Sequence, residues 1–160
     1  MIGIEYAFAL KFIHVLAAAV LFGTGLGIAF FTWMAHRTGD VATIAGIAPV
    51  VVVADAVFIA TAVIVQPVSG VLLAWSIGYS LLDGWIAASL ILYVVVGLCW
   101  LPVVVIQIRL RDLARAALKN TAPLPPEYRR LYAIWFWLGW PAFAGVLAIF
   151  ALMIWKPVAW

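Results

Sequence analysis

The sequence predicts an all-α integral membrane protein that folds as a four-helix bundle. Apolar residues make up 69% of the chain and the mean hydropathy is +1.24, so most of the surface must face lipid rather than water. Four apolar segments each exceed the roughly 20 residues that a helix needs to cross a bilayer. None of them alternates apolar and polar residues as a strand of a membrane barrel does, so helices must satisfy the backbone hydrogen bonds.

The four helices are predicted near residues 6–34, 50–76, 84–118 and 131–155, within one transmembrane domain that covers residues 1–160. The first apolar segment is too long for the core of a secretory signal and follows no basic residues, so we expect a retained helix. Gly78, Asp83 and Gly84 give the second connection the composition of a tight turn. Helix-forming residues continue the third helix beyond its apolar part towards Asn120, and a proline cluster separates it from the fourth.

Basic residues predict the orientation of the bundle. Seven of the nine Lys and Arg residues lie in or beside the first and third connections: Arg37, Arg109, Arg111, Arg115, Lys119, Arg129 and Arg130. The positive-inside rule places these connections in the cytoplasm and both termini in the periplasm of a bacterial inner membrane. These basic residues therefore set the orientation of the helices and contact anionic membrane lipid, and we expect no nucleic-acid partner.

Cysteine and histidine counts exclude several kinds of site. Cys99 is the only cysteine, so the chain has no internal disulfide, cysteine metal cluster or covalent haem attachment motif. With two histidines, His14 and His36, an all-protein zinc site is not expected. Copper transport is disfavoured because soft ligands are few. The glycines at 23, 25 and 27 lie within a helix and indicate close helix packing rather than a phosphate loop.

The strongest pointer to function is a pair of ionisable residues inside the first apolar segment, Lys11 and His14. Ionisable groups at membrane depth cost several kcal/mol unless they are paired or ligated. His14 lies about 12 Å along the first helix at 1.5 Å per residue. The antiparallel second helix brings Gln66 and Ser69 to the same outer half, where Pro67 frees a backbone carbonyl. Tyr93 of the third helix comes to a similar depth.

These residues predict a cofactor pocket. Small residues, among them Ala18 and Gly25, share the face of His14 and leave room for a flat, bulky ligand. Such a face beside an imidazole suits noncovalent haem, with His14 as axial ligand to the iron and Lys11 paired with a propionate. Gln66 and Tyr93 would line the pocket.

Simpler roles for the same residues stay open. His14 could hydrogen-bond within the bundle while Lys11 reaches outwards. Gln66 could join two helices by a hydrogen bond, and Tyr93 could serve packing alone.

A second polar group is expected in the inner half of the membrane. Asp55 lies 11 residues before Gln66 and on nearly the same helix face, while Gln107 and Arg109 end the apolar part of the third helix at similar depth. An ion pair between Asp55 and Arg109 is the simple expectation, since an unpaired carboxylate would be costly there. The alternative is a proton path from Asp55 towards Gln66.

The run Leu10-Lys11-Phe12-Ile13-His14-Val15, followed by an aromatic stretch ending in His36-Arg37, resembles the first helix of HemJ-type protoporphyrinogen oxidases. This resemblance implies a small helical membrane protein that binds haem b; CopD-like membrane proteins belong to the same broad group. HemJ-type proteins also use a lysine in their third helix, and residues 84–108 contain none, so protoporphyrinogen oxidation is not implied.

Nearly the whole chain is similar to a bacterial family of predicted integral membrane proteins of unknown function. The motifs that carry this similarity are Phe22-Gly23-Thr24-Gly25, Gln66-Pro67, Cys99-Trp100-Leu101-Pro102, Gln107-Ile108-Arg109 and Leu138-Gly139-Trp140-Pro141.

The sequence thus favours a haem b membrane oxidoreductase or electron carrier, whose catalytic residues it does not identify. Two other classes stay open. One is a non-catalytic bundle that acts as an accessory or assembly subunit of a larger membrane complex or as a homo-oligomer. The other is a small transporter, although the bundle offers no charged central pathway.

Overall fold

The computed structural model describes residues 2–157, which form helices and no strands. Its elements are α1 (Ile2–Thr38), α2 (Val41–Ala54), the π-helical turn η1 (Asp55–Ile59), α3 (Ala60–Ser76), α4 (Gly84–Lys119) and α5 (Pro126–Trp155). Because α2, η1 and α3 follow one another without a break, the described residues form four helices long and apolar enough to cross a membrane. The predicted all-α membrane bundle is confirmed.

The second and fourth helices begin well before the residues at which hydropathy predicts them, and the residues at their starts explain both differences. The second begins at Val41 rather than near residue 50, because the Asp40 carboxylate accepts hydrogen bonds from the backbone N–H groups of Ala42 and Thr43. A hydrogen bond from the Thr43 hydroxyl also holds the pKa of Asp40 below its ordinary value. The fourth begins at Pro126 rather than near residue 131, since proline is well suited to the first turn of a helix.

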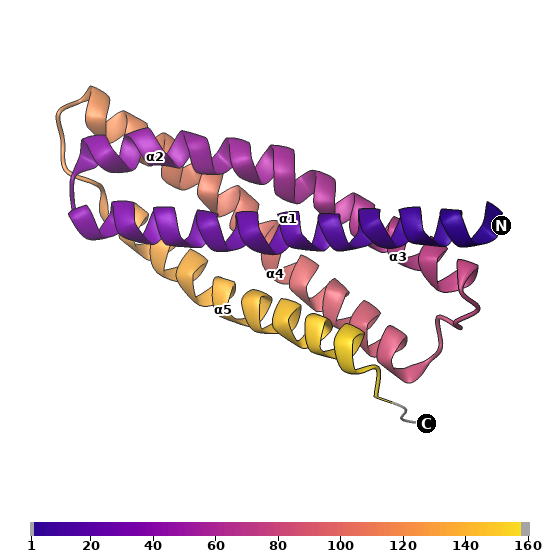
Figure 1. Ribbon diagram of the computed structural model, residues 1–160. Helices are drawn as coiled ribbons and strands as arrows, with labels where there is room; N and C mark the ends of the chain where they lie inside the picture. Colours follow the sequence, from indigo (N-terminus) through magenta and orange to yellow (C-terminus); the bar gives the residue numbers. More distant parts are fainter. Residues whose placement is uncertain (1, 158–160) are drawn as a thin grey trace.

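The helices form a bundle that is tight at one end and open at the other (Figure 1). α1 packs on α2 and α3, α2 packs on α4, and α4 packs on α5. A cluster of buried residues fills the end away from the termini: Ile28, Ala35, Ile44, Val51, Ile106, Leu110, Ala114, Tyr128 and Trp135 are among its members. Towards the termini, which lie at the same end, α3 and α4 diverge (Figure 1). The candidate site lies in this open half.

The π-helical turn η1 interrupts the second membrane span near its middle. The backbone N–H of Ala60 bonds to the carbonyl of Asp55, five residues earlier, which is the π-helical pattern. Asp55 and Ile59 are both buried. Turns of this kind inside α-helices often occur at functional sites, and here one places a carboxylate inside the bundle.

Reporter fusions can test the orientation that the basic residues predict. A fusion at Gly78 and one after Trp160 should both report the periplasm, and one at Lys119 should report the cytoplasm, because the basic connections stay inside. Paired phosphatase and fluorescent-protein activities would measure this. A periplasmic location for Lys119 would contradict the predicted orientation and would mean that the bundle is inserted the other way round.

Candidate functional site

His14 lies where α1 crosses α3, and its imidazole contacts three polar groups of α3. Nδ1 is 3.1 Å from both the backbone oxygen of Gln66 and the hydroxyl of Ser69. A carbonyl oxygen can only accept, so Nδ1 carries the proton and donates. The Ser69 hydroxyl is itself 2.7 Å from the Val65 carbonyl, to which it donates. In the neutral ring, Nε2 therefore holds a lone pair, and it accepts from the side-chain amide of Gln66 at 3.3 Å.

A glycine makes room for this imidazole. A Cβ at Gly70 would lie 2.8 Å from His14 Cε1 and 3.3 Å from its Nδ1. Both distances are shorter than ordinary van der Waals contact, so the ring rests directly on the backbone of α3. The bare surface at Gly70 allows α1 and α3 to approach closely enough for the hydrogen bonds of His14.

Tyr93 joins α4 to α3 through a carbonyl that Pro67 leaves free. Proline has no backbone N–H, so the carbonyl of Val63, four residues earlier, lacks its helical donor. The hydroxyl of Tyr93 donates a hydrogen bond to this carbonyl. The free carbonyl that the sequence analysis placed near His14 and Gln66 is thus satisfied by a neighbouring helix.

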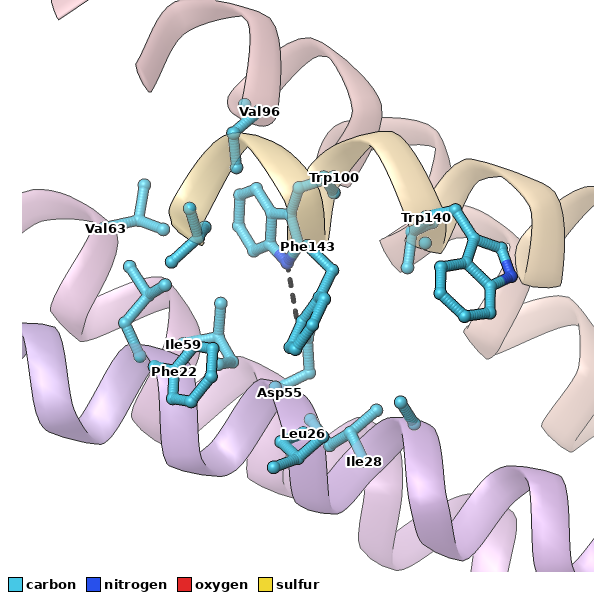
Figure 2. Close-up of a pocket in the computed structure, with 18 of the residues that line it drawn as sticks. Phe22, Leu26, Ile28, Asp55, Ile59, Val63, Val96, Trp100, Trp140 and Phe143 are labelled. Carbon is cyan, nitrogen blue, oxygen red and sulfur yellow. Dashed lines mark hydrogen bonds between the residues drawn. The ribbon is translucent and has the colours of Figure 1, made fainter. Parts of the chain in front are cut away.

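A cavity of about 370 Å³ lies beside these contacts, between α1, η1, α3, α4 and α5. Of the predicted site residues, Gly25, Gln66 and Tyr93 line it. Its walls are mostly apolar and aromatic, and they include Phe22, Trp100, Phe136, Trp140 and Phe143; several are drawn in Figure 2. Phe22 of α1 stacks on Phe143 of α5, with ring centroids 5.4 Å apart, and so joins two walls of the cavity.

His14 and Lys11 do not line this cavity. His14 lies one helical turn before Ala18, which does line it, and the Gln66 side chain contacts both the imidazole and the cavity. Lys11 is exposed on α1. The structure therefore brings His14, Gln66 and Ser69 together and places Tyr93 and Gly25 at the cavity, but it leaves Lys11 outside it.

The buried Asp55 has a different partner from the one predicted. Its side chain is 4% exposed, and Oδ1 accepts a hydrogen bond from the indole N–H of Trp100 at 3.1 Å (Figure 2). The predicted ion pair with Arg109 is wrong, because Arg109 bonds to Glu127 at 3.0 Å. Arg109 lies about 14 Å further along α4 than Trp100 at 1.5 Å per residue, level with the first turn of α5, where both charges are exposed.

Two buried amide oxygens complete the polar part of the cavity wall. Oε1 of Gln66 and Oε1 of Gln107 have no hydrogen-bond partner among residues 2–157, and both residues line the cavity. Buried polar atoms are almost always paired. Gln107 was expected near the depth of Asp55, without a role, and its missing hydrogen-bond partner could not be predicted from the sequence.

The second histidine belongs to another part of the bundle. His36 lies about 33 Å along α1 from His14 at 1.5 Å per residue. Its ring stacks on Tyr132 with centroids 3.6 Å apart and is half-buried. The distance makes His36 a suitable control for experiments on His14.

Comparison with known proteins gives one family. A model described as "Predicted integral membrane protein (DUF2269)" matches residues 8–157, and this match confirms the similarity to a membrane family of unknown function. The chain matches no curated protein and no solved structure.

Proposed function

This chain belongs to the predicted integral membrane protein family DUF2269, and we propose for it a haem b-dependent redox role in the membrane, as an oxidoreductase or electron carrier. His14 is the proposed axial ligand. The observation that carries this proposal is the hydrogen-bonding of its ring: Nδ1–H donates to the Gln66 carbonyl and to Ser69. Histidines that bind metals usually donate their other N–H in this way, because it fixes the tautomer and leaves Nε2 as a basic lone pair.

The cavity next to His14 supports a flat apolar cofactor, and the Gln66 side chain lies between the imidazole and the cavity. The volume of the cavity is in the range of small-molecule sites. Small residues, Ala18 and Gly25, open its α1 wall, and Phe22, Trp100 and Phe143 offer aromatic faces. Lone-pair donation from Nε2 to iron would replace one hydrogen bond, that of the Gln66 amide. The resemblance of Leu10–Val15 to the first helix of HemJ-type proteins supports the same ligand.

The chain's own residues would hold and orient the cofactor. Haem, when bound, supplies one-electron chemistry at its iron. Gln66 and Tyr93 contribute polar contacts to the pocket, and Tyr93 also fixes α4 against α3 through the Val63 carbonyl. Lys11 lies one turn nearer the N-terminus than His14 and is exposed, so its proposed role is to pair with a propionate outside the apolar cavity.

A purified sample tests this proposal directly. Protein solubilised in mild detergent from haem-sufficient cells should show a haem absorption band. His14→Ala should lose it, since no other histidine lies within about 33 Å along α1. His36→Ala should keep it. Carbon monoxide should shift the band of the reduced protein, because the chain offers no second histidine for the sixth position. A colourless wild type, or full haem retention in His14→Ala, would refute the proposal.

An accessory role in a larger complex is the second candidate, and one observation favours it. Leu26 of α1 and Trp140 of α5 both line the cavity and are 48% and 57% exposed. The cavity therefore opens sideways between these helices, where a helix of another subunit would pack against apolar side chains. Blue native electrophoresis of membranes distinguishes this role, since an accessory subunit should migrate with a larger assembly.

A further inference from the structure

The cavity contains a buried carboxylate with no positive charge beside it. Asp55 and Gln107 are 4% and 5% exposed, and both line the cavity. No Lys, Arg or His occurs among the described residues that form its walls. The indole of Trp100 provides Asp55 with one hydrogen bond, but an indole carries no charge. An ionised carboxylate at membrane depth costs several kcal/mol unless it is paired.

We propose that this cavity binds a lipophilic organic cation, whose charged group pairs with Asp55 and whose apolar body lies against the aromatic walls. A cation supplies the charge that the walls lack. The faces of Trp100, Trp140 and Phe143 add to the attraction, because aromatic rings attract cations through their quadrupole. The free Oε1 of Gln107, about 10 Å further along α4 than Trp100 at 1.5 Å per residue, accepts a hydrogen bond from a donor elsewhere on an elongated ligand.

The position of the opening decides where the ligand comes from. Leu26 and Trp140, which are among the exposed wall residues, belong to membrane-spanning parts of α1 and α5. The cavity thus opens towards the lipid, and Asp55 lies about 5 Å from the middle of the 36-residue span Val41–Ser76 at 1.5 Å per residue. A ligand must dissolve in the bilayer to reach the carboxylate, which favours a cation with a large apolar body over an inorganic ion.

This proposal does not depend on haem binding, although the two ligands would share one cavity and its aromatic walls. It depends on Asp55, Trp100 and Gln107 and uses none of the contacts of His14. When both are prepared without haem, the His14→Ala protein and the wild type should therefore bind the cation equally, and a failure of one proposal leaves the other testable.

Two probes of similar size and opposite charge test it. Tetraphenylphosphonium should bind the detergent-solubilised protein at least tenfold more tightly than tetraphenylborate, as measured by equilibrium dialysis. Asp55→Asn keeps an acceptor for Trp100 but removes the charge, so its affinity for the phosphonium should fall tenfold or more. Asp112→Asn is the matched control, because Asp112 pairs with Arg111 on the exposed part of α4 and its loss should change nothing.

A second variant keeps the test valid if Asp55→Asn does not fold. Trp100→Phe retains the carboxylate and an aromatic face while removing the hydrogen bond from the indole, so it should still prefer the phosphonium. Equal binding of the two probes by the wild type, or unchanged phosphonium binding by folded Asp55→Asn, would overturn the proposal.

Discussion

Replacing Gly70 with valine is expected to destabilise the bundle by roughly 2 kcal/mol or more. The new Cβ would lie 2.8 Å from His14 Cε1, and overpacking of this kind costs about 1–3 kcal/mol. The imidazole must move, and its hydrogen bonds to Gln66 and Ser69 are each worth about 0.5–1.5 kcal/mol. Thermal unfolding in detergent, followed by circular dichroism, would measure the loss.

Gly23→Val is the matched control for Gly70→Val. Gly23 is an exposed helical glycine of α1, and a Cβ there would meet nothing within 4 Å. Its replacement should leave the stability nearly unchanged, because the extra side chain faces lipid. Equal melting temperatures for the two valine variants would mean that the imidazole does not pack on Gly70. If haem is bound, Gly70→Val should also lower its retention, while Gly23→Val should not.

The common depth of His14, Gln66 and Ser69 could be predicted from the sequence. Each residue advances a helix by 1.5 Å, and two helices joined by a connection must run in opposite directions. These two rules place residue 14 beside residues 66 and 69, where the structure has them. The same rules predict a similar depth for Tyr93, and the structure joins its hydroxyl to the carbonyl that Pro67 frees. Depth is the part of a membrane bundle that a sequence determines well.

Unlike depth, the rotation of each helix about its axis and the contacts that its long side chains make could not be predicted from the sequence. Opposite charge predicted an ion pair between Asp55 and Arg109. In the structure, the indole of Trp100 donates a hydrogen bond to Asp55, and Arg109 pairs with Glu127. Lys11 and His14, three residues apart, lie on different faces relative to the cavity, and neither lines it. The divergence of α3 and α4 that opens the cavity depends on packing between helices distant in sequence, for which the apolar pattern carries no signal.

The helix starts show a local signal that hydropathy overlooks. Asp40 precedes Val41 and accepts hydrogen bonds from two backbone N–H groups of the first turn, as capping aspartates do. Averages of hydropathy place the start of a helix where apolar residues become dense, which is nine residues later. Capping residues and the proline at 126 are better markers of these ends.

The bond between Tyr93 and the Val63 carbonyl should be strongly coupled to Pro67. Tyr93→Phe removes the hydroxyl that donates to this carbonyl, and a buried acceptor left unsatisfied costs about 1–3 kcal/mol. In a Pro67→Ala background, the backbone N–H of residue 67 can donate to Val63 as in a regular helix. Tyr93→Phe should then cost much less. A double-mutant cycle, measured by unfolding in mixed detergent micelles, isolates this coupling.

The cycle separates a hydrogen bond from a packing role for Tyr93. If the tyrosine only packs, its ring is preserved in phenylalanine, and Tyr93→Phe should cost little in either background. If the hydroxyl satisfies the carbonyl, the cost should be large with Pro67 and small with Ala at that position, with a coupling of about 1 kcal/mol or more. Tyr6→Phe is the control, since Tyr6 is exposed on α1 and its change should be neutral in both backgrounds. An equal cost of Tyr93→Phe with and without Pro67 would show that the freed carbonyl is not what holds α4 against α3.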